Sequence, residues 1–208
     1  MRKTFFPIVV AMLLLCACGK NNEKQLYGGI RETDKYNDLY GGSTEVRAEL
    51  AYVTDDEIPE LLVSDGDYHA SGITVFTLDQ SENIISLGTF GSNGEFEYAE
   101  KEGYISCEYG NQGSFFHTIS AVGKNTKLIG AVFALVNGVT GEERYFTDFA
   151  PSGMTGDNSF DYLLYSVPDT NEVTEDEYQK AYDELMSVSQ EWIEISYEEM
   201  ASIDSIVR

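Results

Sequence analysis

Basic residues are scarce in this chain of 208 residues. Lysine and arginine together number 13, against 36 aspartates and glutamates, and the formal net charge is −23. Nucleic-acid binding depends on clustered Lys and Arg that neutralise phosphates, so the composition argues against a nucleic-acid-binding protein. The same charge opposes a surface that lies flat on anionic lipid. It favours a soluble domain held away from a membrane, or a cationic partner, although a need for solubility would also account for it.

Cysteine and histidine are few as well. Beyond residue 18 the only cysteine is Cys107, so no disulfide is expected within the folded part. Cys107 lies in the alternating stretch GYISCEYG, which predicts a strand, and we interpret it as a small buried apolar residue. The two histidines, His69 and His117, are too few for a histidine-rich zinc site. His117 lies in another predicted strand, and we interpret it as packed or as exposed at an edge.

Long apolar runs are limited to one segment near the start of the chain. Residues 5–15 are almost all apolar, follow the basic pair Arg2 and Lys3, and precede several small residues. A transmembrane helix needs about 20 apolar residues, so this run is too short for a comfortable membrane span. A basic start, a short apolar core and small residues before a cleavage point are instead typical of an export signal.

The end of that segment, Leu15-Cys16-Ala17-Cys18, resembles the lipobox of bacterial lipoproteins. The resemblance implies that residues 1–17 are a signal peptide and that Cys18 is lipidated with a diacylglycerol, to which some bacteria add a further acyl chain such as palmitate. Cys18 fits better than Cys16 because a small residue directly precedes it. Since each buried methylene contributes about 0.8 kcal/mol, two chains hold a protein firmly on a membrane. A plain secretory signal with two incidental cysteines is the alternative.

These features predict three segments and one location. Residues 1–17 are the signal peptide, residues 18–30 a polar lipidated tether, and residues 31–208 a single β-rich domain. Loss of residues 1–17 would leave 11 basic and 36 acidic residues, a net charge of −25. We expect an exported protein that is lipid-anchored at the outer face of the cell membrane.

The pattern within the domain is mostly that of strands. From about residue 46 to residue 149, short segments alternate apolar and polar residues and are separated by Gly, Asn and Asp, which predicts antiparallel strands joined by hairpins. Residues 191–195, EWIEI, also have an extended pattern. The fold class expected is α+β, mainly an antiparallel β meander with two C-terminal helices.

Two capping signals place those helices. Thr174 is followed three residues later by Glu177, which predicts a capping box and the start of a helix at Thr174, within the helically patterned residues 173–188. Ser196 and Glu199 repeat the spacing and predict a second helix directly afterwards. Packing of both helices on the sheet is the expected arrangement, and a partner-binding helix is the alternative.

An acidic stretch, residues 51–67 (AYVTDDEIPELLVSDGD), resembles a family motif. It is similar to the strand-loop-strand of FG-GAP and VCBS-type β-repeats, as found in uncharacterised lipoproteins of clostridia-like bacteria. Those repeats read D-x-D-G-D-G-x-x-E-L, and residues 58–63 match the second half of the motif. Tyr52 and Thr54 replace its first two aspartates.

The resemblance implies a calcium site near this hairpin. The candidate ligands are Asp56, Glu57 and Glu60. Ca²⁺ takes about 6–8 oxygen ligands, so a loop that lacks the first two aspartates would bind it weakly. The alternative is an acidic hairpin turn derived from a binding ancestor. No other cofactor is expected.

Three functions fit these observations, and no catalytic residue can be named. The sequence contains no G-x-S-x-G, H-E-x-x-H or S-x-x-K motif. The first function is a non-catalytic binding or scaffold domain for a protein or glycan, and a smooth charged surface with an aromatic patch and no cleft would favour it. The second is a hydrolase of cell-wall or carbohydrate polymers, favoured by an aromatic groove with two carboxylates about 5–9 Å apart. The third is a calcium-dependent adhesion module.

Overall fold

The structure, a computed structural model, covers most of the predicted domain. It describes residues 25–206 except residues 27, 44, 70, 112 and 150–170. Cys18 and the predicted signal peptide lie outside the described residues. Among the residues that are described, no helix is both long enough and apolar enough to cross a membrane.

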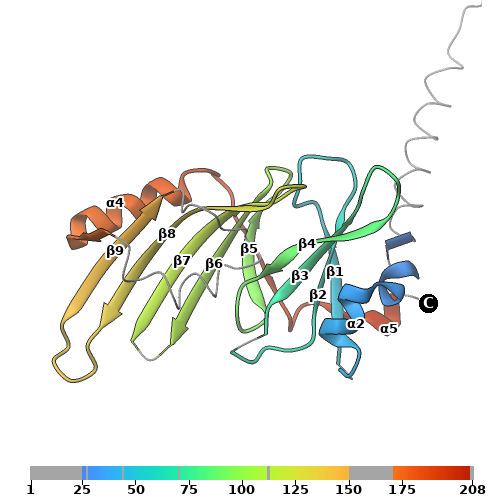
Figure 1. Ribbon diagram of the computed structural model, residues 1–208, viewed down its shortest axis with the longest axis horizontal. Helices are drawn as coiled ribbons and strands as arrows, with labels where there is room; N and C mark the ends of the chain where they lie inside the picture. Colours follow the sequence, from blue (N-terminus) through green and yellow to red (C-terminus); the bar gives the residue numbers. More distant parts are fainter. Residues whose placement is uncertain are drawn as a thin grey trace, which may run out of the picture.

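The smaller of two antiparallel sheets has five strands in the order β12-β1-β2-β3-β4 (Figure 1). These strands are β1 (Arg47–Ala51), β2 (Glu60–Ser64), β3 (Ile73–Leu78), β4 (Ile84–Phe90) and β12 (Ala201–Ser202). Strands β1 to β4 form a meander, and β12 joins its edge from the C-terminal end of the chain. Every residue of β2 and β3 is buried, as expected for strands covered on both faces.

The larger sheet has seven strands in the order β10-β9-β8-β7-β6-β5-β11. They are β5 (Glu95–Ala99), β6 (Tyr104–Asn111), β7 (Ser114–Ala121), β8 (Lys127–Val136), β9 (Glu143–Phe149), β10 (Asn171–Val173) and β11 (Ile193–Ser196). Strands β5 to β9 form a second meander, and the C-terminal part of the chain supplies both edge strands. The expected α+β class, mainly an antiparallel β meander, is therefore confirmed, as is the extended conformation at EWIEI.

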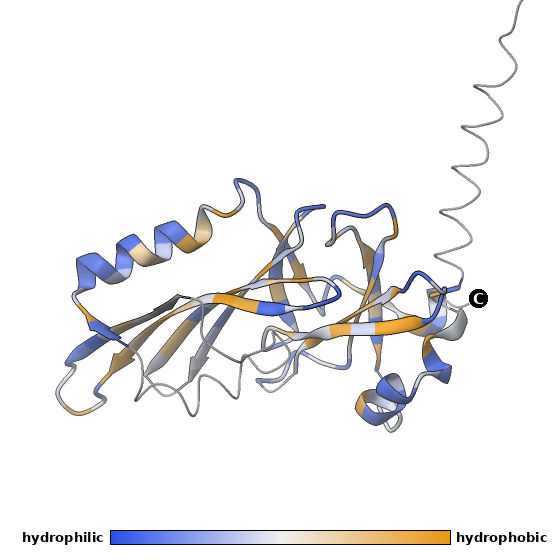
Figure 2. Cartoon of the chain, turned by 45° about the horizontal axis from the view of Figure 1, so that its top comes forward, coloured by the Kyte–Doolittle hydropathy of each residue, from blue (hydrophilic) through white to orange (hydrophobic). Residues whose placement is uncertain are grey.

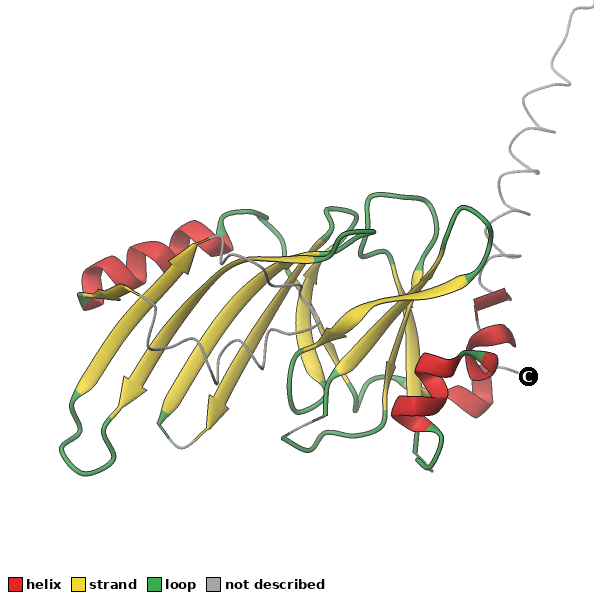
Figure 3. Ribbon diagram, in the orientation of Figure 1, coloured by secondary structure: helices red, strands yellow, loops and turns green. Residues whose placement is uncertain are grey.

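Three apolar clusters hold the fold together. The largest contains residues of both sheets, for example Leu62 and Val75 with Ile105 and Ala131. A second lies between the small sheet and the helices η1 (Ile30–Glu32), α2 (Asp34–Tyr40) and α5 (Ile203–Ile206). A third lies between the large sheet and α4 (Glu175–Met186). Helix α4 and the pair α2 and α5 consequently lie at opposite ends of the molecule (Figure 3).

Helix α4 begins where the sequence predicts. The Thr174 hydroxyl accepts a hydrogen bond from the Glu177 backbone N–H, and the Glu177 carboxylate accepts one from the Thr174 N–H. Figure 2 shows α4 as mostly hydrophilic with interspersed apolar positions, and of these Ala181 and Leu185 are buried. The helix therefore depends on a good cap and on a narrow apolar contact with the sheet.

Removing the cap is expected to destabilise the protein measurably. Thr174→Ala leaves the N–H of Glu177 without its side-chain acceptor, which costs about 1 kcal/mol. Thermal unfolding should show a melting temperature lower by roughly 3 °C. Thr174→Ser keeps the hydroxyl and should melt like the wild type, so equal losses in the two variants would contradict the capping account.

The second C-terminal helix starts later than predicted. Residues 197–200 form a turn, after which β12 pairs with β1 and α5 begins only at Ile203. The helix predicted directly after Ser196 is wrong because Met200 is buried in the largest apolar cluster, against both sheets. Sheet pairing at residues 201–202 then prevents helical hydrogen bonding there.

The predicted tether is also too long. Leu26 and Ile30 are completely buried, and Ile30 packs with the residues beneath α2. The folded part therefore includes the last residues of the segment 18–30. Cys107 is confirmed as a buried apolar residue, and burial raises the pKa of its thiol to about 12, which makes the thiol unreactive.

Candidate functional site

A cleft of about 310 Å³ lies between α4 and the strands β5, β6 and β11 of the large sheet. Its lining includes four glutamates together with the larger side chains of α4. These are Glu95, Glu97, Glu108 and Glu194 with Tyr182 and Met186. None of the described residues that line it is a lysine or an arginine. An adjoining hollow of about 340 Å³ shares Glu95, Glu108 and Tyr182 with it and continues toward His117.

The strand register explains why these glutamates meet. Side chains two residues apart on a strand share a face, so Glu95 and Glu97 project from the same side of β5. Across the sheet, Glu194 of β11 pairs with Glu97, and Glu97 pairs in turn with Ser106 of β6. Directly opposite residues have Cβ atoms about 5 Å apart. The sheet therefore presents a row of carboxylates to α4.

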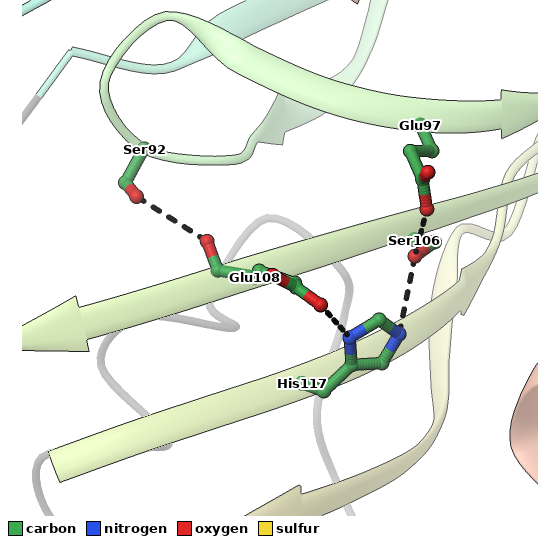
Figure 4. A network of polar contacts seen from close by, with 5 residues as sticks. All are labelled: Ser92, Glu97, Ser106, Glu108 and His117. Atoms are coloured by element: carbon green, nitrogen blue, oxygen red, sulfur yellow. Dashed lines mark hydrogen bonds and ion pairs between the residues drawn. The ribbon is translucent and has the colours of Figure 1, made fainter. Parts of the chain in front are cut away.

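A chain of polar contacts runs across three strands of this face (Figure 4). The Ser106 Oγ lies 3.3 Å from Glu97 Oε2 and 3.1 Å from His117 Nε2. The other ring nitrogen, His117 Nδ1, lies 3.3 Å from Glu108 Oε1. Ser106 and His117 are only 1% and 3% exposed. The buried imidazole and hydroxyl thus connect two glutamates of the cleft.

Helix α4 closes this face with aromatic and apolar side chains. Ala181 and Leu185, four residues apart, pack on Ile119 in the third apolar cluster. Tyr182, which follows Ala181 on α4, packs against His117 in an edge-to-face arrangement with the ring centroids 4.9 Å apart. Tyr182 therefore belongs both to the wall of the cleft and to the surroundings of the imidazole.

The electrostatic environment of the cleft is strongly negative. Burial lowers the pKa of His117, whereas the Glu108 carboxylate raises it, and the net direction is below the usual value. Burial also raises the pKa of Tyr182, and the nearby charges of Glu108 and Glu97 raise it further. Tyrosine at this position is therefore neutral at physiological pH.

Within the described part of the chain, no lysine or arginine forms an ion pair with a glutamate of the cleft. Like charges directly opposite on neighbouring strands are destabilising, and Glu194 and Glu97 are such a pair. No ion pair among the described residues includes Glu95, Glu97 or Glu194. A sheet face of this kind would gain stability from a positively charged ligand.

Glu60, one of the three predicted calcium ligands, is engaged inside the protein. It is completely buried at the start of β2. One carboxylate oxygen accepts hydrogen bonds from the N–H groups of Val53 and Thr54, at 2.8 and 3.2 Å. The other accepts from the hydroxyls of Thr54 and Thr77, at 2.7 and 3.4 Å. Through these hydrogen bonds, Glu60 at the start of β2 holds the residues that directly follow β1 and so fixes the loop between the two strands.

The other two predicted ligands have separate partners. Asp56 Oδ1 accepts a hydrogen bond from the Ile58 N–H at 2.7 Å, and Glu57 forms an ion pair with Lys101 at 3.3 Å. Within the described ranges no group of three or more His, Cys, Asp or Glu side chains is arranged to hold a metal ion. The structure therefore does not bring Asp56, Glu57 and Glu60 together as a calcium site.

No family model, curated protein or solved structure matches this chain. The resemblance of residues 51–67 to FG-GAP and VCBS-type repeats stays a prediction. Any functional interpretation therefore rests on the geometry of the molecule.

The sequence alone did not single out the glutamates of the cleft. The signal that could have found them is the run EFEYAEKEGYISCEY, in which Glu95, Glu97, Ser106 and Glu108 all fall on alternate positions of two strands joined by a short turn. His117 is packed within its strand, one of the two positions that its sequence allowed. Its connection to Glu108 depends on strand pairing, which a single sequence does not reveal.

Proposed function

We propose that this protein is a bacterial lipoprotein whose domain binds a small organic cation at the outer face of the cell membrane. The observation that carries the proposal is the cleft beneath α4, where glutamates from three strands face the aromatic ring of Tyr182. The binding is non-catalytic. The ligand chemistry is that of an alkylammonium group, either on a free amine or on a lysine side chain.

Three physical properties of the cleft support this ligand class. Hydrogen bonds between an ammonium group and carboxylates are roughly twice as strong as neutral ones. A tyrosine face beside a carboxylate also suits a cation that carries an apolar body, for which Met186 offers further contact. Finally, a cavity of about 310 Å³ lies at the lower end of the range, roughly 300–1,000 Å³, that small ligands occupy in proteins.

The net charge of the chain adds a kinetic advantage. A formal charge of −23 creates a negative potential around the whole domain. Such a field steers cations toward the surface and raises their association rate, and the effect weakens as salt increases. The strong acidity of the sequence therefore supports the same ligand class as the cleft.

Calorimetric titration of the full-length protein in detergent tests the proposal. Spermidine, a linear triamine, represents the free amines, and trilysine represents a basic peptide. At least one of them should bind at one site per chain, with an affinity that falls as salt is added. Trialanine, which lacks side-chain charge, should not bind. Failure of both amines to bind at low salt would overturn the proposal.

The lipid anchor is tested by its own variant. Cys18→Ser removes the thiol that would carry the diacylglycerol, so the protein should move entirely from the membrane fraction to the medium or the soluble extract. Detergent phase partitioning and intact-mass spectrometry measure this change. Cys16→Ser is the matched control and should stay in the membrane fraction. A Cys18→Ser protein that remains membrane-bound would contradict the anchor.

A hydrolase is the second candidate, because the cleft combines aromatic side chains with carboxylates. Ser106, His117 and Glu108 also stand in the order of a nucleophile, a base and an orienting acid. Two features disfavour catalysis. Ser106 is 1% exposed in mid-strand, and its hydroxyl also faces Glu97. The Glu108 side chain is 76% exposed, whereas the carboxylate that orients a catalytic histidine is buried.

A chemical probe separates the two candidates. A fluorophosphonate labels serine nucleophiles that a histidine activates, and the binding proposal expects no labelling of Ser106. The same protein should release no soluble sugar from peptidoglycan. Stable labelling of Ser106, or sugar release that Glu97→Gln abolishes, would replace the binding function with a hydrolytic one.

A further inference from the structure

We infer that cation binding in the cleft is coupled to protonation of His117. The cation binds more weakly when both ring nitrogens of His117 are protonated, and a bound cation in turn disfavours that protonation. The inference rests on the proposed function and adds a regulatory property to the same site. The supporting observation is the set of contacts Glu97–Ser106–His117–Glu108, in which a buried imidazole lies between two carboxylates.

The number of hydrogen-bond donors differs between two protonation states of this network of polar contacts. Ser106 has one O–H and can donate either to Glu97 or to His117 Nε2. When both ring nitrogens are protonated, His117 donates to Glu108 and to Ser106, and Ser106 then donates to Glu97. All three contacts are then hydrogen bonds, in which each carboxylate is an acceptor.

The neutral imidazole cannot maintain all three bonds. With its proton on Nδ1, His117 still donates to Glu108, but Nε2 now needs a donor and takes the Ser106 hydroxyl. Glu97 then loses its donor, and its carboxylate is available to a ligand in the cleft. Loss of the imidazole charge also makes the cleft more negative. Both consequences favour a bound cation.

The groups that face His117 set the pH range of this change. Glu108 on β6 contacts the ring, and Glu95 on β5 with Tyr178 and Tyr182 on α4 line the same hollow. Glu97 on β5 is connected to the ring through Ser106. Burial raises the pKa of both tyrosines, so they stay neutral below the ordinary tyrosine range. The charge near the imidazole therefore comes from glutamates, and burial of the ring opposes its protonation. The cation should bind at neutral pH and be released under mild acid.

Nuclear magnetic resonance of the histidine ring carbons tests the coupling directly in the wild-type protein. The pH is varied from about 8 to about 5, the range in which imidazole titrates. Saturating spermidine should lower the titration midpoint of His117, because a bound cation disfavours a second positive charge. The exposed His69 does not line the cleft and provides the internal control, so its ring-carbon signal should respond to spermidine far less than that of His117.

Calorimetry with the same ligand measures the reciprocal effect. The wild-type affinity for spermidine should weaken by on the order of tenfold as His117 gains its proton, which corresponds to about 1.4 kcal/mol. His117→Gln keeps a neutral hydrogen-bonding side chain and should lose most of this pH dependence. His69→Gln should retain it in full. All three proteins contain the same glutamates, so the comparison isolates the imidazole.

The possible results distinguish failure of the coupling to His117 from failure of the proposed cation binding. If spermidine does not bind the wild type at any pH, the proposed function and the coupling are both overturned. Binding with a stationary His117 midpoint and an unchanged affinity across the pH range would overturn the coupling alone. The ring-carbon measurement needs no variant, so a folding defect in His117→Gln would not obscure the result.

Discussion

Replacing Glu97 and Glu194 together with glutamine is expected to weaken spermidine binding by on the order of 100-fold while making the protein slightly more stable. The two carboxylates are directly opposite on β5 and β11. A hydrogen bond to a charged group contributes about 1.5–3 kcal/mol, so loss of two such contacts accounts for the affinity change. Removal of like charges at opposed positions explains the gain in stability. Calorimetry and thermal unfolding of the same samples measure both effects.

A matched control variant distinguishes the effect of the cleft glutamates on affinity from the effect of the protein's overall negative charge. Glu100→Gln with Glu102→Gln removes the same charge from exposed residues near the turn between β5 and β6. Affinity should change less than about threefold there, through weaker long-range attraction alone. If this control lost as much affinity as the variant in the cleft, binding would be a property of net charge and the cleft would have no specific role. The opposite response of stability and binding is typical of a functional site that opposes folding.

Replacing Glu60 with alanine is expected to cause a large loss of stability. The variant leaves the N–H groups of Val53 and Thr54 buried without their acceptor. Each buried unsatisfied group costs about 1–3 kcal/mol, so the total is on the order of 3 kcal/mol. For a chain of this size the melting temperature should fall by roughly 10 °C. Glu60→Gln retains one carbonyl oxygen for the two N–H groups and should lose much less.

The pH dependence of stability provides an independent check on Glu60. Burial raises the pKa of Glu60 above its ordinary value of 4.5, and the hydrogen bonds from Thr54 and Val53 partly oppose this rise. The folded state therefore holds the proton more tightly than the unfolded state. Its contribution to stability is greatest below pH 4.5 and declines as the pH rises through the folded pKa.

Glu60→Gln cannot titrate and should lack that decline. The difference in unfolding free energy between wild type and Glu60→Gln, followed from acidic to neutral pH, isolates this residue from all other carboxylates. A difference that does not change with pH would show that Glu60 is not held in the buried environment described above.

The sequence was informative where local patterns decide the structure. Alternating residues predict the strands, and Thr174 with Glu177 locates the start of α4. The same spacing at Ser196 and Glu199 misleads, because Met200 is drawn into the apolar cluster between the sheets and residues 201–202 pair with β1. Tertiary packing there overrides a local signal whose contribution is only about 1 kcal/mol.

The candidate site depends on information that a single sequence does not contain. Glu95 and Glu97 could be placed on one face of a strand from alternation alone. Glu194 joins them only because β11, nearly a hundred residues later, pairs with β5 at the edge of the sheet. Glu60 shows that a sequence motif can also mislead. It stands in an apparent metal-ligand motif, but its carboxylate accepts hydrogen bonds from the backbone instead.

A crystal structure of the protein with spermidine tests the central claim most directly. We expect one triamine in the cleft under α4, with an ammonium nitrogen within hydrogen-bond distance of Glu97 and Glu194 and the carbon chain against Tyr182. Spermidine bound elsewhere on the surface, with the cleft closed or filled by the protein's own side chains, would contradict it.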